Sequence, residues 1–555
     1  MRKLSLLILS TLLTFTAYAE IAETAAIDKV FSQWDHPGSP GASVGVIKDG
    51  ELIFSGGYGM ANLEYDIPNS SKSVFRIGST SKQFTAASII LLVEKGKISL
   101  SDTLNQFFPD FPDYAKTITI SHLLNHTSGI RDYLTLADLS GKRSDDYYTD
   151  DDIMHWLINQ QQTNFNPGDE FLYSNSGYWL LGQIVEHVSG INMAEFAQRE
   201  IFEPLAMNHT HFHNDHNQIV KNRASGYVPS GENQYEISMT TLDMIGDGGI
   251  FTSVEDIKKW DDAYYNNKVF SKKFWSMMTK RGQLNSGEVI DYASGLFLGE
   301  YKGLKMISHG GSFVGFRANL IRFPEQKFSV VVFANRGDAN PTRMAFQVAD
   351  IFLKNDYEEN NSADKAKESV AVEIELNPAE LENVLVLYWN DERSDSRKIY
   401  IKDNKLIFSL NENREFNLTA IGNNKFVATG VPFEMNVAFY SDEQSRNIMA
   451  VTINGDTPVL SVGYKPASYK RQELNKFEGS YFNNELNVSY VLKVEHEELK
   501  LFVNNRSYSP LTTVMNDLFV NNQVGAFKFE RDSTGRITGF KLAAGRVKNL
   551  TFSRL

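Results

Sequence analysis

"RIGSTSKQFTA", residues Arg76–Ala86, places a serine and a lysine three residues apart at the start of an apolar run. On a helix, positions i and i+3 lie on one face, so Ser79 and Lys82 would project together. A lysine in an apolar site loses its proton more easily and can then accept one from a neighbouring hydroxyl. The pattern therefore indicates either a nucleophilic serine or a helix cap followed by a surface lysine, and taken alone it favours the second.

The four-residue pattern is not specific, because "SADK" at Ser362–Lys365 also fits it. The residues after Ser79 are more informative. Residues Phe84–Val93 are apolar nearly all round, and Gly96 is placed to end a helix. A helix that is apolar on every side is buried. We therefore expect Ser79 at the N-terminal end of a central helix.

Composition limits the classes of function. The chain has 555 residues, of which 42% are hydrophobic and 22% charged, which is typical of a soluble globular protein with two or three domains. It has no cysteine, which excludes disulfides, thiolate metal sites, a cysteine nucleophile and a lipid-modified cysteine. The formal net charge is −13 and no basic block is present, so nucleic acid is not an expected partner.

The first residues are typical of a secretory signal peptide. Arg2 and Lys3 precede an apolar core at Leu4–Thr16 and a small-residue cleavage site at Ala17–Ala19. We expect residues 1–19 to be removed and the protein to be secreted or periplasmic. The apolar core is too short to span a bilayer comfortably, and no later run is suited to it, so stable membrane insertion is not expected.

Residues 20–354 mix strand and helix patterns in a way that predicts an α/β sandwich. Residues 42–60 indicate a β-hairpin that turns at Asp49-Gly50. The remaining expected elements are helices at Ser176–Gly190 and Ser253–Tyr265, the second with a Ser253/Asp256 capping box, and a buried strand in Lys327–Gly337.

The remainder of the chain has a different character. Residues 355–374 are polar and aperiodic, which predicts a linker. After it the sequence repeats with a period of 93 and alternates apolar with polar positions, as half-buried strands do. Matching pairs are Tyr388/Tyr481, Asn390/Asn483, Leu406/Leu499 and Phe426/Phe519. We expect two small all-β modules, barrels or sandwiches, at residues 375–469 and 470–555.

Two further motifs accompany Ser79 and Lys82. Tyr173-Ser174-Asn175 precedes an expected helix, although Tyr-x-Asn recurs in this chain and usually marks a core aromatic residue beside a loop asparagine. His309-Gly310-Gly311-Ser312 falls at an expected strand edge. Two glycines in a strand let a ligand or another backbone segment approach closely, or they form a bulge or turn.

Together the three motifs are much more specific than any one of them. With "GYGMANLE" (Gly57–Glu64) and "GDGGIFTSVEDIKKW" (Gly246–Trp260), the sequence resembles the serine β-lactamase and penicillin-binding-protein superfamily over roughly residues 25–354. It is most similar to the class C β-lactamase-like branch, which includes D-aminopeptidases, esterases and D,D-carboxypeptidases. The resemblance implies a β-lactamase/transpeptidase-like α/β (α+β) sandwich with an antiparallel sheet and a helical subdomain.

The resemblance also implies roles for individual residues. Ser79 would form an acyl-enzyme, and Lys82 would accept or relay its proton. Tyr173 would pass a proton to the leaving group, and Asn175 would orient the lysine and the substrate amide. The backbone N–H groups of Ser79 and Ser312 would form the oxyanion hole, in which one donor is worth ~3 kcal/mol. Whether Lys82 or Tyr173 is the acylation base stays open.

The His309-Gly310-Gly311 motif departs from the Lys-Thr-Gly motif of β-lactamases. The lysine of that motif is a permanent cation, whereas histidine is mostly neutral at pH 7. Gly310 also lacks the hydroxyl of the threonine, so recognition of a substrate carboxylate at this place is in doubt. His-Gly-Gly followed by two β modules is similar to D-aminopeptidase relatives.

The predicted function is an exported serine hydrolase that cleaves amide or ester bonds of small or peptide-like substrates, with D-amino-acid-containing substrates favoured and peptidoglycan-derived fragments among them. The alternatives are a carboxylesterase or weak β-lactamase, and a cell-wall-fragment binding protein whose hydrolase site is idle. No cofactor and no metal are expected, although "MNHTHFHNDHNQ" contains His209, His211, His213 and His216. His126 is expected to anchor a loop.

Overall fold

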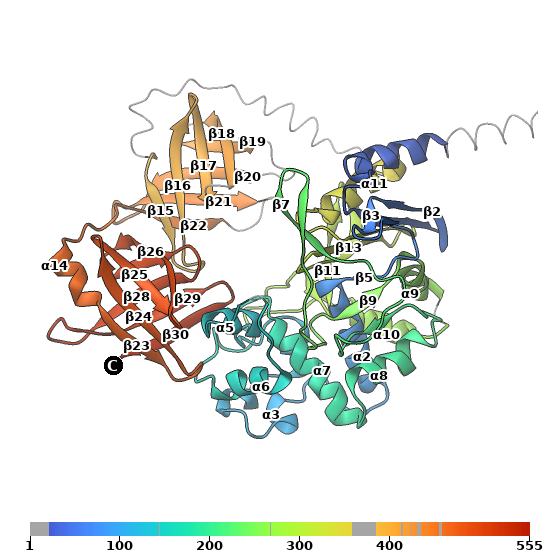
Figure 1. Ribbon diagram of the computed structural model, residues 1–555, viewed down its shortest axis with the longest axis horizontal. Coiled ribbons are helices and arrows are strands. Elements are labelled where there is room, and N and C mark those ends of the chain that lie inside the picture. The colour runs from blue at the N-terminus through green and yellow to red at the C-terminus, as the bar shows by residue number, and fades with distance from the viewer. Residues whose placement is uncertain are drawn as a thin grey trace, which may run out of the picture. The chain divides into compact units, whose positions relative to one another are not determined.

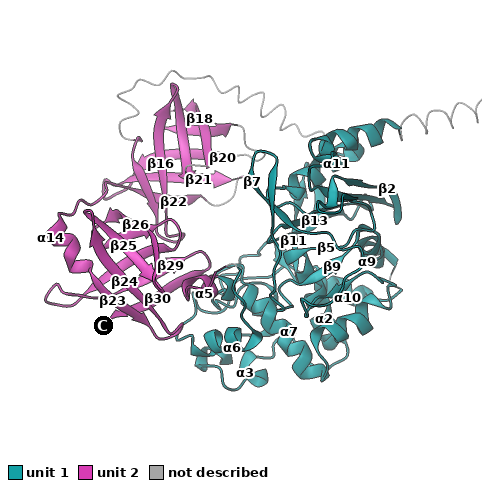
Figure 2. Ribbon diagram, in the orientation of Figure 1, with its two compact units in different colours: residues 1–134, 144–359 teal, residues 135–143, 360–555 magenta. Residues whose placement is uncertain are grey.

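The computed structural model describes residues 21–143, 145–266, 268–357, 384–411, 414–422, 424–429, 435–453 and 458–555 (Figure 1). The chain divides into two compact units, residues 1–134 with 144–359 and residues 135–143 with 360–555 (Figure 2). The expected signal peptide at 1–19 and "SADK" at 362–365 lie outside the described residues, as does most of the expected linker at 355–374.

An antiparallel sheet forms the centre of unit 1. Within the described residues it has seven strands in the order β10-β11-β12-β13-β14-β1-β2. Asp49 and Gly50 both have positive φ values, 49° and 82°, so the expected hairpin turn is confirmed. The strands are β1 (Ala42–Lys48), β2 (Glu51–Tyr58), β10 (Tyr292–Ala293), β11 (Leu296–Tyr301), β12 (Leu304–Phe313), β13 (Phe316–Phe323) and β14 (Phe328–Ala334).

Helices cover both faces of this sheet. Side chains alternate between the faces of a strand, so Ile321 and Arg322 on β13 point to opposite sides. Ile321 joins the apolar cluster that includes Met344 of α11 (Pro341–Leu353). Arg322 forms a buried ion pair, 2.7 Å long, with Asp261 of α9 (Val254–Asn266). The expected sandwich of helices on a sheet is therefore confirmed.

The other helices of unit 1 surround α2 (Lys82–Glu94), in which Lys82–Ile90 and Leu92 are buried, as its apolar sequence predicted. α2 packs against α7 (Asn175–Ser189) and α10 (Lys272–Met278). Other elements of unit 1 are α3 (Leu104–Phe107), α4 (Ile120–Leu124), α6 (Asp150–Asn159), α8 (Met193–Ala197), β3 (Met60–Asn62), β4 (Ile67–Pro68), β7 (Tyr227–Gly231) and β8 (Gln234–Ile237). α5 (Tyr133–Leu139) crosses from one unit to the other.

The expected capping box of α9 is only half formed. The Asp256 backbone N–H donates to Ser253 Oγ at 3.3 Å. The Asp256 carboxylate instead accepts from the His209 backbone and from Thr210 Oγ1, at 2.7 and 2.9 Å. The sequence interpretation was right for one of the two bonds only, because the buried carboxylate accepts from donors in a segment distant in sequence.

Unit 2 contains two closed antiparallel barrels, each of eight strands within the described residues. The first comprises β15 (Leu387–Asn390), β16 (Asp395–Lys402), β17 (Lys405–Asn411), β18 (Arg414–Gly422), β19 (Lys425–Thr429), β20 (Met435–Ser441), β21 (Asn447–Ile453) and β22 (Val459–Tyr464). The second comprises β23 (Gly479–Asn483), β24 (Val488–Glu495), β25 (Glu498–Val503), β26 (Arg506–Met515), β27 (Leu518–Asn521), β28 (Gly525–Arg531), β29 (Ile537–Ala544) and β30 (Val547–Arg554).

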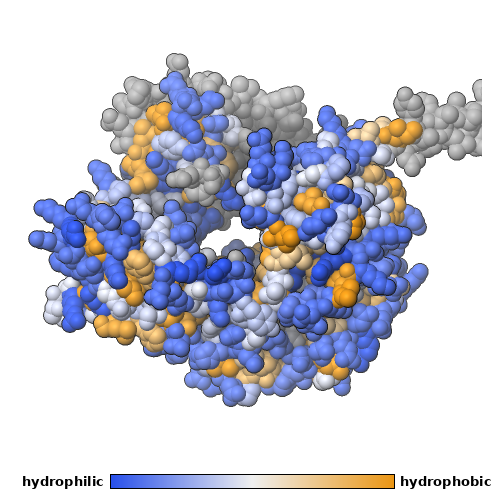
Figure 3. Space-filling model, in the orientation of Figure 1, coloured by the Kyte–Doolittle hydropathy of each residue, from blue (hydrophilic) through white to orange (hydrophobic). Residues whose placement is uncertain are grey.

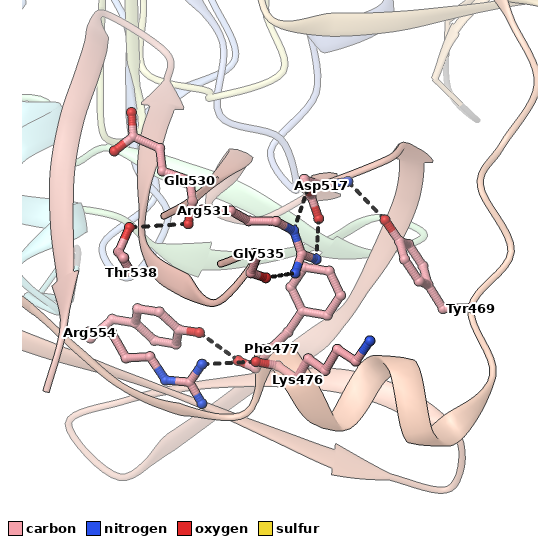
Figure 4. A network of polar contacts seen from close by, with 10 residues as sticks. Tyr469, Lys476, Phe477, Asp517, Glu530, Arg531, Gly535, Thr538 and Arg554 are labelled. Carbon is pink, nitrogen blue, oxygen red and sulfur yellow. Dashed lines mark hydrogen bonds and ion pairs between the residues drawn. The ribbon is translucent and has the colours of Figure 1, made fainter. Parts of the chain in front are cut away.

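Equivalent positions of the sequence repeat make equivalent contacts. Tyr388 and Tyr481 are fully buried, and each hydroxyl donates to the carbonyl four residues before it. The second barrel has an additional polar network in which Arg531 makes two contacts with Asp517, 2.7 and 2.8 Å long (Figure 4). Such paired contacts hold neighbouring strands in register.

The surface is mostly polar. Figure 3 shows hydrophilic side chains over most of the visible face, with hydrophobic residues in separated patches. Among the described helices, none is long and apolar enough to cross a membrane.

Candidate active site

Ser79 lies in a 3-10 turn, η2 (Gly78–Ser81), that continues directly into α2. It is half-buried and does not cap the helix, because Ser81 is the N-cap residue and makes no side-chain cap bond. The turn is fixed beside β12, since Thr80 Oγ1 donates to the His309 carbonyl at 3.2 Å. The helix-cap alternative for Ser79 is therefore wrong.

Lys82 is completely buried, so the surface-lysine alternative is also wrong. Its Nζ atom lies 2.8 Å from Asn175 Oδ1, 2.5 Å from the Asp247 carbonyl oxygen and 3.4 Å from Ser79 Oγ. The two carbonyl oxygens can only accept, so each takes an N–H of the lysine. The remaining position on the nitrogen faces Ser79 Oγ, where a neutral amine would present its lone pair to the hydroxyl.

The aromatic ring of Tyr173 lies beside this lysine. The centre of its ring is 4.9 Å from Lys82 Nζ and 6.2 Å from the ring of His309. His126 holds the segment in place, because its Nδ1 accepts from the Ser174 backbone at 3.1 Å and its ring lies 4.1 Å from that of Tyr173. The expected role of His126 as a loop anchor is confirmed.

Asn175 is the first residue of α7 and is 4% exposed. Its side-chain oxygen accepts from Lys82, while its backbone N–H donates to Asp132 Oδ2 at 2.7 Å. The next residue, Ser176, donates to the Arg131 carbonyl at 2.6 Å. The loop at 131–132 therefore fixes the start of α7 and with it the amide that contacts Lys82.

Asp247 is a site residue that the sequence motifs did not single out. Its carbonyl accepts from Lys82, and its buried carboxylate accepts from Tyr133 Oη at 3.0 Å. Burial raises the pKa of this carboxyl group, and the charge of Lys82 opposes that rise. The signal available in the sequence is the aspartate between glycines, since Gly246 and Gly249 have φ values of 107° and 92° that favour glycine.

His309 is 3% exposed and is held from two sides. Its Nδ1 lies 2.6 Å from the Gly310 carbonyl oxygen and therefore carries the proton, so Nε2 accepts from Tyr292 Oη at 3.2 Å. Burial, together with the nearby charge of Lys82, lowers the pKa of His309 to about 3. The histidine is neutral at pH 7, as its sequence suggested, and Tyr292 is a second residue that the motifs missed.

The two glycines of the His-Gly-Gly motif have different surroundings. A Cβ atom on Gly311 would lie 1.9 Å from the Ile77 carbonyl oxygen, so only glycine lets β12 lie this close to the turn before Ser79. A Cβ atom on Gly310 would meet Asn319 Nδ2 at 3.5 Å, an ordinary contact. Gly78 (φ 51°) lies in the turn before Ser79 that β12 approaches, and a Cβ atom on it would lie 2.9 Å from Ser312 N.

The histidines of the histidine-rich stretch are not among the residues that contact Lys82 in the described part of the chain. His216 Nδ1 pairs with Asp243 Oδ2 at 2.9 Å, and His211 Nε2 lies 3.2 Å from His213 Nδ1. Among the described residues, no group of three or more histidine, cysteine, aspartate or glutamate side chains is arranged to hold a metal ion.

The difference between the two glycines gives a matched pair of variants. Gly311→Ala should lower stability by about 1–3 kcal/mol, because the new methyl group overlaps backbone atoms that cannot move freely. Gly310→Ala should stay within about 0.5 kcal/mol of the wild type. Denaturant unfolding of both variants measures this, and equal losses would contradict the packing described for β12.

The burial of His309 predicts how stability depends on pH. Its pKa is lowered from 6.5 to about 3 in the folded protein, so the unfolded chain binds the proton first as the pH falls. Stability should therefore be lost progressively between about pH 6.5 and pH 3. Thermal unfolding at several pH values should show a shallower loss for His309→Gln, whereas His155→Gln, at an exposed position, should follow the wild type.

Comparisons with known proteins agree with this arrangement. Penicillin-binding protein 4* of Bacillus subtilis (strain 168) is 32% identical over 302 residues, which are 52% of this chain and 66% of the relative. D-aminopeptidase of Gluconobacter oxydans (strain 621H) is 26% identical over 300 residues, 54% of this chain and 56% of the relative. The chain therefore spans less than two thirds of the length of these relatives.

A solved structure, the octameric penicillin-binding protein homologue from Pyrococcus abyssi, has a similar fold. It superposes with a TM-score of 0.54 and 23% identity over 82% of this chain and 99% of that one. The family model described as Beta-lactamase matches residues 27–351, the region that holds every residue of the site. This match shows that the chain is an enzyme of the Beta-lactamase family of serine hydrolases.

Proposed function

We propose that this enzyme hydrolyses amide bonds in D-amino acid amides or short D-amino-acid-containing peptides through an acyl-enzyme on Ser79. The observation that carries the proposal is the set of contacts around Lys82. Two carbonyl oxygens occupy two positions on its buried nitrogen, and the third faces Ser79 Oγ at 3.4 Å. A lysine held in this way is placed to take the proton of the serine hydroxyl.

In the acylation step, Ser79 Oγ attacks the substrate carbonyl carbon and its proton passes to Lys82. The carbonyl oxygen becomes an oxyanion beside the backbone N–H groups of Ser79 and Ser312, where loss of one donor typically costs ~3 kcal/mol. The carbon–nitrogen bond then breaks, and the leaving amine takes a proton from the relay of Lys82 and Tyr173.

In the deacylation step, a water molecule attacks the ester carbon and gives its proton to the same relay. The bond from that carbon to Ser79 Oγ breaks, and the serine recovers its proton as the acid leaves. Asn175 keeps the lysine nitrogen in place in both steps, because its Oδ1 accepts from that nitrogen and its backbone N–H donates to Asp132.

The neutral state of His309 supports the choice of substrate. A buried imidazole with a pKa of about 3 offers no permanent positive charge to a substrate carboxylate, unlike a lysine at this place. The similarity to a D-aminopeptidase supports the same class of substrate. The expected signal peptide supports a secreted or periplasmic enzyme that acts on peptidoglycan-derived fragments.

Replacing Ser79 with alanine should abolish turnover and covalent labelling by a fluorophosphonate probe, because the nucleophile is removed while the fold is kept. Ser101→Ala, at an exposed position, should behave as the wild type in both assays. Gel fluorescence and a turnover assay measure the two effects, and labelling of the Ser79→Ala protein would argue against Ser79 as the nucleophile.

One panel of substrates tests the reaction class. D-alanine p-nitroanilide should be cleaved with a kcat/KM at least about tenfold above that of its L-enantiomer and above that of nitrocefin. A p-nitrophenyl ester and a D-Ala-D-Ala peptide complete the panel. Preference for the ester or for nitrocefin would instead favour a carboxylesterase or a β-lactamase, and no turnover of any member would favour a binding protein with an idle site.

A further inference from the structure

Arg76 is a buried cation that the mechanism does not use. It lies on β5 (Phe75–Arg76), three residues before Ser79, and is 6% exposed. Its guanidinium carbon lies 5.0 Å from the centre of the Phe313 ring and 5.9 Å from that of Phe251. Nε is buried without a hydrogen-bond partner, and within the described residues Arg76 makes no ion pair.

The cost of burying an unpaired charge makes this arrangement unusual. An arginine placed in a protein interior is normally matched by a carboxylate or by several carbonyl oxygens. Here burial lowers the pKa of Arg76 to about 10, so the group is still positive at pH 7. The aromatic rings supply only part of the compensation, because a cation–π contact leaves the N–H donors unsatisfied.

The two carboxylates whose charges act on Arg76 have other partners. Asp243 and Asp247 act on its charge, but Asp243 pairs with His216 at 2.9 Å and Asp247 accepts from Tyr133 at 3.0 Å. The described part of the chain thus provides no counter-ion that is bound to Arg76.

The guanidinium lines a small pocket with other basic side chains. His213, His216 and Arg223 form part of the wall, and Thr240 and Val314 form another part. The enclosed volume is about 20 Å³, which is room for a single water-sized group. Burial and the neighbouring positive groups lower the pKa of His213 to about 4. This histidine is therefore neutral at pH 7, and the positive charge in the pocket wall comes from the arginines.

Two residues that line the pocket are close in sequence to residues of the active site. Arg76 is three residues from Ser79, a span of at most ~11 Å between Cα atoms. Val314 is two residues after Ser312, which the proposed mechanism places at the oxyanion. The pocket is therefore lined by residues of the two chain segments that also carry Ser79 and Ser312.

We propose that this pocket binds a carboxylate group, with Arg76 as its buried partner and Arg223 at its exposed rim. Guanidinium groups bind carboxylates with charge-assisted hydrogen bonds, and one oxygen atom fits the available volume. The carboxylate comes either from the substrate itself or from a free acid such as the released amino acid. If the carboxylate belongs to the substrate, this inference rests on the proposed amide hydrolysis. The substrates are then peptides that have a free carboxyl terminus.

Binding of a simple carboxylate tests the pocket without any turnover. Sodium acetate should raise the thermal unfolding temperature of the Ser79→Ala protein, and uncharged acetamide at the same concentration should not. The rise should be lost in an added Arg223→Gln substitution, which lies at the surface and leaves the core intact, and kept in Lys221→Gln, an exposed cation outside the pocket. Equal rises with acetate in all three proteins, or none in any, would overturn the proposal.

Kinetics then identify the source of the carboxylate. D-alanylglycine and D-alanylglycinamide share one scissile bond and differ in the carboxylate, so the ratio of their kcat/KM values should be at least about tenfold in favour of the acid. Arg223→Gln, and Arg76→Gln if it folds, should bring this ratio close to one, whereas Lys221→Gln should preserve it.

A ratio near one in the wild type, combined with binding of acetate, would assign the pocket to a free acid. If neither dipeptide is cleaved, the proposed amide hydrolysis fails while the acetate measurement still decides the pocket. Acetate binding that persists in both arginine variants would overturn the assignment of Arg76 and Arg223.

Discussion

A lysine that is completely buried needs an acceptor for every proton it carries, and the site of this enzyme is arranged around that requirement. Lys82 finds carbonyl oxygens of Asn175 and Asp247, and its third neighbour is the serine hydroxyl. No carboxylate is bonded to it within the described residues, and its hydrogen-bond partners are carbonyl and hydroxyl oxygens. The same contacts hold three separate segments of unit 1 at one point.

A second constraint is the close approach of two backbone segments. The turn before Ser79 and the strand that carries His309 touch at Gly78 and Gly311, where side chains would overlap backbone atoms. This approach brings the Ser312 nitrogen close to the serine turn, and His309 on the same strand is buried and bonded to Tyr292. The histidine is therefore neutral because it is buried, and it offers no positive charge to a carboxylate. The buried guanidinium of Arg76, which makes no ion pair within the described residues, is the partner proposed for such a carboxylate.

Local sequence predicted those parts of the fold that local interactions determine. The apolar surface of residues 84–93 predicted a buried helix, and Asp49-Gly50 predicted a hairpin turn. The period of 93 predicted two similar all-β modules, and the equivalent bonds of Tyr388 and Tyr481 agree with it. The capping box at Ser253 and Asp256 formed only one of its two bonds because a distant segment offered the carboxylate other donors.

The sequence by itself determined that Ser79 and Lys82 share one face at the start of a buried helix, since that depends only on their spacing and on the apolar residues after them. The family-like motifs also determined which distant segments to expect beside them. Only the tertiary structure decided that Asp247 contacts the lysine, that burial keeps His309 neutral and that Arg76 Nε has no hydrogen-bond partner within the described residues. These properties depend on burial and on contacts between residues far apart in the chain, and the pattern of a short stretch carries no information about either.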